Sequence, residues 1–152
     1  MEKVKLKIFL IVLGAVLIGC IVLAFFVNRP EQFNVSDEEL QLMSRTVYGE
    51  ARGEIYRGKV AVAAVILNRV KSDGFPSTIA DVIYQPNAFT AVNDGQINLG
   101  TDEECMQACR DALKGKDPTR GCVYYYNPKT ATNQWIKSRP VVVTIGRHVF
   151  CK

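Results

Sequence analysis

The strongest constraint on how this 152-residue chain can fold is an uncharged, apolar run at residues 8–27. A helix needs about 20 consecutive apolar residues to cross the hydrocarbon core of a membrane. Three lysines lie in residues 1–7, whereas only Arg29 follows the run closely. Basic residues tend to stay on the cytoplasmic side. The pattern therefore predicts a cytoplasmic basic tail at 1–7, a single-pass transmembrane anchor at 8–27 in the cytoplasmic membrane, and an extracytoplasmic domain.

Two alternatives remain open for this run. A cleaved signal peptide usually has a shorter apolar region that ends in small residues. The segment 17–20, Leu-Ile-Gly-Cys, resembles a lipoprotein cleavage box, although residues 21–27 stay apolar after its cysteine. Either alternative also exports the rest of the chain.

Beyond the run, residues 28–35 are predicted to form a linker, and residues 36–152 are long enough for one domain with its own core. The 19 Lys and Arg residues and 15 Asp and Glu residues leave a formal net charge of +4. This excess is small, scattered and not interleaved with aromatic residues, so it predicts no nucleic-acid partner. The sequence does not indicate an oligomeric state.

Capping motifs and apolar periodicity predict that most of the domain is helical. Ser36 and Glu39 have the spacing of a capping box at the start of a helix, and Thr101 and Glu104 have the same spacing. The segment 57–70 is apolar nearly all round in its middle, which is typical of a helix buried in a core.

Toward the C-terminus the pattern of apolar residues changes from helical to strand-like. After a short helix at 79–83 and the second capped helix, strands are predicted at 123–126, 141–145 and 148–150, with a long polar loop at 127–140. The predicted fold class is α+β, a mainly helical domain with a small antiparallel β element after the transmembrane helix.

Four cysteines lie in the predicted domain, at Cys105, Cys109, Cys122 and Cys151. An even number outside the membrane favours disulfides, with three pairings that sequence cannot rank. Buried free thiols are the alternative, because two of the four fall on the apolar face of a predicted helix. No C-x-x-C pair is present and His148 is the only histidine, so no metal site is predicted.

One carboxylate interrupts an apolar stripe. Met43, Val47 and Glu50 share one face of the helix that starts after Ser36. Loss of hydration there disfavours the ionised form, so the pKa of Glu50 is expected to rise and the group can serve as a general acid. The alternatives are a glutamate paired with Arg45 or Arg52, or one that reaches solvent at the helix end.

The neighbours of Glu50 carry weaker signals. Gly49 removes side-chain bulk and would let a polymer approach closely. Gly53 is expected to end the helix before Glu54, which is interpreted as structural, capping the next helix or holding Arg52.

Several segments together resemble the SleB/CwlJ-type cell wall hydrolases, known as spore cortex-lytic enzymes. They are YGEARGE, GKVAVAAVILNRV, FP, DVIYQ, YYYNP, W-x-x-S-R-P and IGRHVFCK, and they span roughly residues 40–152. The resemblance implies a fold like that of lysozyme and the lytic transglycosylases. It also assigns the catalytic role to the first glutamate of E-A-R-G-E, which is Glu50.

The implied chemistry is cleavage of the β-1,4 bond between N-acetylmuramic acid and N-acetylglucosamine in peptidoglycan. Glu50 would protonate the leaving oxygen, and the muramic 6-hydroxyl would then attack C1 to leave a 1,6-anhydro end. This reaction needs no cofactor and no second carboxylate. A hydrolytic muramidase of the same fold and a non-catalytic, membrane-tethered wall-binding protein are the alternatives.

Four further residues are predicted to bind substrate. Tyr125 and Trp135 present aromatic faces that suit sugar rings, Asn127 can hydrogen-bond an acetamido group, and Phe89 matches a Q-x-x-x-F pattern of the resembling family. The alternatives are sheet core for the tyrosine and a simple turn for the asparagine. His148 is interpreted as structural.

Overall fold

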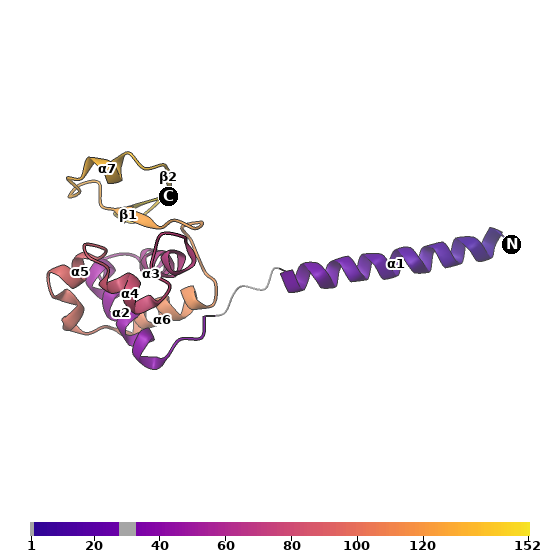
Figure 1. Cartoon of the computed structure of the whole chain (residues 1–152), viewed down its shortest axis with the longest axis horizontal. Helices are drawn as coiled ribbons and strands as arrows, with labels where there is room; N and C mark the ends of the chain where they lie inside the picture. The colour runs from indigo at the N-terminus through magenta and orange to yellow at the C-terminus, as the bar shows by residue number, and fades with distance from the viewer. Residues whose placement is uncertain (1, 28–32) are drawn as a thin grey trace. The chain divides into compact units, whose positions relative to one another are not determined.

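The computed structural model describes residues 2–27 and 33–152 of the chain. They belong to two units, Met1–Glu31 and Gln32–Lys152. The first unit contains helix α1 (Glu2–Val27), labelled in Figure 1. The predicted linker at 28–35 lies largely outside the described residues, which do not include 28–32.

The predicted transmembrane anchor requires a correction. Residues 8–27 are helical, but the helix already begins at Glu2, ahead of the apolar run. A span requires about 20 consecutive apolar residues. Across residues 2–27 and 33–152, no helix is long and apolar enough to cross a membrane.

The second unit is mainly helical (Figure 1). Its helices in the first two thirds are α2 (Asp37–Ala51), α3 (Tyr56–Lys71), α4 (Ile79–Tyr84), α5 (Thr90–Asn93), the 3-10 helix η1 (Gln96–Leu99) and α6 (Glu103–Leu113).

Helix α2 begins and ends where local chemistry predicts. The Glu39 N–H donates to Ser36 Oγ at 3.2 Å, and the Ser36 N–H donates to Glu39 Oε2 at 3.0 Å. The predicted capping box is therefore confirmed, and it satisfies two backbone donors that the helix leaves unpaired. The helix ends at Ala51, just before Gly53.

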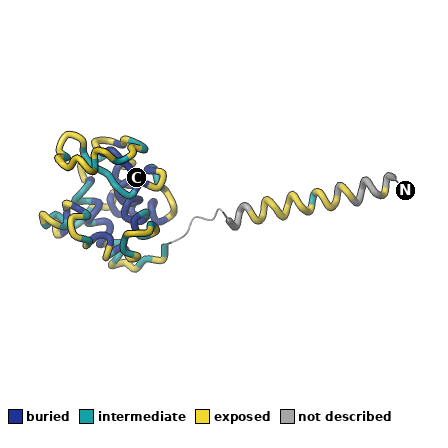
Figure 2. Tube along the Cα trace, turned by 45° about the horizontal axis from the view of Figure 1, so that its top comes forward, coloured by how far each residue is buried: buried dark blue, intermediate teal, exposed yellow. Residues whose placement is uncertain are grey.

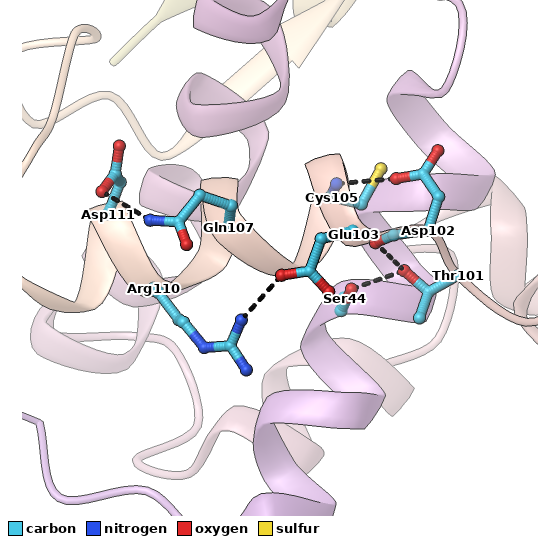
Figure 3. A network of polar contacts seen from close by, with 8 residues as sticks. All are labelled: Ser44, Thr101, Asp102, Glu103, Cys105, Gln107, Arg110 and Asp111. Carbon is cyan, nitrogen blue, oxygen red and sulfur yellow. Dashed lines mark hydrogen bonds and ion pairs between the residues drawn. The ribbon is translucent and has the colours of Figure 1, made fainter.

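Helix α6 begins differently from the prediction. Its N-cap is Asp102, whose Oδ1 accepts the Cys105 N–H at 2.7 Å (Figure 3). Thr101 instead places its hydroxyl 2.5 Å from that of Ser44 and so connects α6 to α2. An aspartate caps as well as a threonine does, and its negative charge also suits the helix N-terminus, which explains the shift by one residue.

Helix α3 is the centre of the core. It packs against α2 and α6, and its middle is almost entirely buried (Figure 2). Val62, Val65 and Ile66 have no exposed surface, and the alanines between them allow close approach of the neighbouring helices. The predicted buried helix is confirmed.

A three-stranded antiparallel sheet follows. Strand β3 (His148–Cys151) lies between β1 (Tyr124–Tyr126) and β2 (Val141–Ile145). Tyr125 faces Phe150 across the β1–β3 pair, and an irregularity between Val141 and Val143 shifts the register of β2. The predicted polar loop also contains a short helix, α7 (Gln134–Lys137). This part of the chain therefore has the mainly helical fold with a small antiparallel sheet that was predicted.

The turn between β2 and β3 is attached to the turn between α2 and α3. Glu54 accepts the Arg147 N–H at 2.9 Å through Oε2 and the Arg147 Nε–H at 2.6 Å through Oε1. Arg147 Nη2 also donates to the Gly53 carbonyl at 2.8 Å. Glu54 is therefore structural, as predicted, but it holds Arg147 rather than Arg52.

All four cysteines of the domain are free and buried, which corrects the predicted disulfides. Cys105 and Cys109 lie on the face of α6 that enters the core, and Cys122 and Cys151 are buried near the sheet. The buried-thiol alternative describes them: each behaves as a small apolar side chain.

Candidate active site

Glu50 lies at a cavity of about 470 Å³ in the second unit. Part of its lining comes from the helical residues Gly49, Glu50, Thr90 and Gln96. The rest comes from strand and loop residues, which are Tyr125, Tyr126, Asn127, Thr130, Ala131, Thr132, Asn133 and His148. Its volume falls in the range of about 300–1,000 Å³ that is usual for small-ligand sites.

Two uncharged donors hold the Glu50 carboxyl group. The Ala91 N–H donates to Oε1 at 2.7 Å, and the Tyr125 hydroxyl donates to Oε2 at 2.8 Å. One donor comes from the helical part of the domain and the other from the sheet.

Among the described residues, neither Arg45 nor Arg52 pairs with Glu50. Arg52 donates to Gln96 Oε1 at 2.5 Å instead. None of the ion pairs among residues 2–27 and 33–152 involves Glu50.

Burial raises the pKa of Glu50 above the ordinary glutamate value, and the hydrogen bonds from Ala91 and Tyr125 oppose that rise. The nearby negative charge of Asp94 adds to it. The pKa of Glu50 is shifted in the expected direction. The immediate surroundings of its carboxyl group, however, differ from the prediction. Met43 and Val47 are fully buried in the core, whereas Glu50 is half-buried at its edge and contacts polar groups.

Gly49 brings α5 close to Glu50. A Cβ atom at this position would clash with the Cβ of Ala91. The absence of a side chain thus lets the Ala91 N–H reach the carboxyl group, which is a different role from the predicted approach of a polymer.

Tyr125 lies between the core and the cavity. Its ring packs against His148, with 5.1 Å between ring centroids, and against Phe150, with 5.7 Å. Its hydroxyl is directed at Glu50, so the structure uses it to orient the carboxyl group, in addition to any contact with substrate.

The other predicted substrate-binding residues differ in position. Asn127 lines the Glu50 cavity, and its Oδ1 also accepts the Lys129 N–H in the following turn. Phe89 is only 2% exposed and belongs to the core, so its predicted contact with sugar is corrected. Trp135 is exposed, but it lines a neighbouring cavity rather than that of Glu50.

Sequence reasoning missed two parts of this site. His148 is 9% exposed and lines the cavity, where its Nδ1 has no hydrogen-bond partner and burial lowers its pKa. Strand alternation with Phe150 is the signal that could have placed it beside Tyr125. The Ala91 donor is a backbone group, for which side-chain patterns contain no signal.

The lining of this cavity limits its chemistry. Glu50 is the only carboxylate among the described residues that line it. Within the same described ranges, no three His, Cys, Asp or Glu residues form a group that could hold a metal ion. The arrangement thus offers one protonatable acid that is oriented by two neutral donors.

Residues 53–151 match the Cell Wall Hydrolase family. The chain belongs to this family. The match begins at Gly53, just after Glu50, and includes the whole sheet. The resemblance noted in the sequence is therefore confirmed.

Among curated proteins, this family member is 58% identical over 116 residues to the spore cortex-lytic enzyme of Halalkalibacterium halodurans. The alignment covers 76% of this chain and 35% of that enzyme. The chain spans less than half the length of the spore cortex-lytic enzymes that it matches.

Two solved structures have the same fold. The catalytic domain of the Bacillus cereus SleB protein is 55% identical with a TM-score of 0.75, covering 78% of this chain and 93% of that one. The catalytic domain of the germination-specific lytic transglycosylase SleB from Bacillus anthracis gives the same identity and TM-score and is covered to 98%.

Proposed function

We propose that this domain cleaves the β-1,4 bond between N-acetylmuramic acid and N-acetylglucosamine in peptidoglycan as a lytic transglycosylase. The observation that carries the proposal is the Glu50 carboxyl group, which lies at a cavity, has a raised pKa and is held by two uncharged donors. Membership of the cell wall hydrolase family supports the substrate class.

Glu50 acts first as an acid and then as a base. Its proton passes to the glycosidic oxygen as the bond from that oxygen to C1 of the muramic ring breaks. The muramic 6-hydroxyl oxygen then bonds to C1 while its proton returns to the Glu50 carboxylate. The products are a free 4-hydroxyl on one sugar and a 1,6-anhydro ring on the other.

The single carboxylate in the cavity favours this reaction over hydrolysis. Hydrolysis of a glycoside usually needs a second carboxylate as base or nucleophile. The nearest candidate, Asp94, is exposed and uses both oxygens to accept hydrogen bonds from Gln96. An internal 6-hydroxyl nucleophile removes the need for such a group.

The names of the relatives suggest the setting of the reaction. We extend the proposal to the peptidoglycan of the spore cortex during germination, since similar catalytic domains come from spore cortex-lytic and germination-specific enzymes. Peptidoglycan lies outside the cytoplasmic membrane, so the proposal requires the domain to act on the extracytoplasmic side.

Digestion of purified cortex and vegetative peptidoglycan by the full chain tests the proposal. The wild-type protein should release fragments with 1,6-anhydromuramic ends, identified by mass spectrometry. Glu50→Gln should cleave about 10²–10⁴-fold more slowly, because it cannot donate the proton. Glu103→Gln, which changes an exposed ion pair on α6, is the matched control and should cleave at the wild-type rate.

Other results would decide between the alternatives. Reducing ends in place of anhydro ends would make the domain a muramidase and contradict the transglycosylase step. A Glu50→Gln variant as fast as wild type would contradict the role of Glu50. Binding of peptidoglycan without cleavage by the wild-type protein would support a non-catalytic wall-binding domain.

A further inference from the structure

A second cavity, of about 490 Å³, adjoins the one that contains Glu50. Tyr125 and Asn133 line both cavities, so the two form a continuous surface on either side of Tyr125. A linear polymer with one unit in the Glu50 cavity would continue into this second cavity. Apart from Tyr125, the polar and charged groups that line it have no part in the proposed reaction.

Trp135 provides an exposed aromatic face at this cavity. Its side chain is 53% exposed, and its ring lies edge-on to Tyr124 with 5.2 Å between centroids. The Arg139 guanidinium lies 5.1 Å from the ring centroid, and the Trp135 backbone N–H donates to Asn133 Oδ1 at 2.9 Å, which caps helix α7. An exposed indole that packs against Tyr124 and Arg139 is preorganised to stack on a ligand ring.

Arg69 provides a cation in the same cavity. It is 6% exposed, its Nε donates to the Val123 carbonyl at 2.8 Å, and its Nη1 donates to the Ala88 carbonyl at 3.4 Å. Aromatic rings surround it, including that of Phe89 at 4.8 Å. In the described part of the chain no carboxylate forms an ion pair with Arg69.

The guanidinium retains unused donors that reach the cavity. Arginine has five N–H donors, and backbone carbonyls accept from only two of its nitrogens here. No acceptor for Nη2 lies among the described residues, and Arg69 lines the cavity. The charge of Glu50 acts on Arg69, but no carboxylate among the described residues forms an ion pair with it. A buried guanidinium with free donors is suited to an acceptor oxygen on a ligand.

We propose that this second cavity binds the sugar unit adjacent to the one at Glu50. The sugar ring stacks on Trp135, and an oxygen of one ring substituent accepts from Arg69. That oxygen belongs either to an acetamido carbonyl or to the carboxyl of a muramic lactyl group. The proposal rests on the proposed function, and it makes Arg69 a specificity-determining residue.

Intrinsic fluorescence tests the sugar contact without any cleavage, since Trp135 is the only tryptophan of the chain. The full-length Glu50→Gln variant is titrated with chitin oligosaccharides and with peptide-free glycan strands. A saturable change in tryptophan emission is expected with strands long enough to fill both cavities. An unchanged emission spectrum under conditions where the strands are shown to bind would overturn the proposal.

Kinetics on peptidoglycan provide the second test. Trp135→Ala should raise KM about tenfold, the loss expected for an aromatic anchor, with little change in kcat. Tyr84→Ala is the matched control, because Tyr84 is similarly exposed and lines neither cavity. Equal KM values for Trp135→Ala, Tyr84→Ala and wild type would contradict the proposal.

Arg69→Lys distinguishes the two sources of the acceptor oxygen. Weaker binding of both kinds of strand would indicate the acetamido carbonyl, and weaker binding of the muramic strands alone would indicate the lactyl carboxyl. Unchanged binding of both, with a native melting temperature, would overturn the role of Arg69. If Arg69→Lys does not fold, the Trp135→Ala result decides. Failure of the proposed function is separate, because it abolishes cleavage by the wild-type protein.

Discussion

The Glu50 carboxyl group is held by neutral donors, and these partners affect its pKa. A guanidinium partner would stabilise the ionised form strongly and lower the pKa. The Ala91 N–H and the Tyr125 hydroxyl fix the direction of the carboxyl group with a smaller preference for the ionised form. The effect of burial is larger than that of these hydrogen bonds, so the pKa of Glu50 rises. The residue is thus oriented without losing its ability to hold a proton.

The pH dependence of cleavage follows from this shift. A general acid is active while it is protonated, so kcat should fall as the pH rises through the pKa of Glu50. Because burial raises that pKa, activity should persist above the range near pH 4.3 in which an ordinary glutamate ionises. Initial rates on purified peptidoglycan across pH 4–9 measure the effect. A falling limb centred at the ordinary glutamate value would contradict it.

At the scale of elements, the contact between α2 and α5 depends on Gly49. Gly49→Ala should destabilise the domain by about 1–3 kcal/mol through overpacking against Ala91. The better helix propensity of alanine offsets about 1 kcal/mol of this. Cleavage should fall as well, because displacement of α5 removes the Ala91 donor from Glu50.

Urea unfolding and initial rates check this prediction together. Gln41→Ala, at an exposed position of α2, is the control and should retain both stability and activity. A Gly49→Ala protein with wild-type rates would show that α5 tolerates the added methyl group.

The attachment of the sheet to the helices depends on Glu54. Burial alone would raise the pKa of Glu54, but the hydrogen bonds from Arg147 bring it below the ordinary value. This contribution to stability is present above the unfolded-state pKa and is lost as the pH falls through the lower folded-state pKa.

Glu54→Gln should therefore cost about 1–3 kcal/mol, since it removes a charge that is 4% exposed and accepts two hydrogen bonds. Glu103→Gln breaks the exposed pair with Arg110 and should cost under about 1 kcal/mol (Figure 3). Denaturant unfolding at neutral pH compares the two variants. Equal losses would mean that the Glu54 contact does not anchor the turn.

For the Gln32–Lys152 unit as a whole, the site exists only when both layers are folded. Glu50 comes from the helices, and Tyr125 and His148 come from the sheet. The core that joins the layers contains free cysteines, which pack there as apolar side chains. Burial raises the pKa of Cys105 to about 12, so its reactive thiolate is suppressed.

Thiol titration checks the state of the cysteines. Under denaturing, non-reducing conditions all five cysteines of the chain should react with a thiol reagent. In the native protein the four buried ones should react slowly. A reducing agent should leave the melting temperature unchanged. Fewer than five reactive thiols in the denatured protein would indicate a disulfide.

Several features of the unit could be predicted from sequence because they depend on neighbours along the chain. The capping box at Ser36, the apolar middle of α3 and the β-branched residues of β2 each identify an element locally. Glu50 was found in the same way, from the spacing of an apolar stripe. The resemblance to a known family independently selected the same residue.

The remaining features depend on contacts between distant segments. Phe89 and Trp135 are both aromatic residues predicted to contact sugar, yet Phe89 lies in the core and Trp135 at a cavity, because tertiary packing decides their exposure. The partner of Glu54 is 93 residues away in the chain. The membrane prediction rested on the length of an apolar run, and the described helices do not bear it out.

Direct measurement of the Glu50 pKa tests the central claim most closely. NMR titration of the full chain with ¹³C-labelled glutamate follows each carboxyl carbon, and Glu50→Gln identifies the signal by its loss. The midpoint of Glu50 should lie above the ordinary glutamate range and above that of Glu54 in the same spectra. A Glu50 midpoint at or below the ordinary value would rule out Glu50 as an acid held protonated by burial.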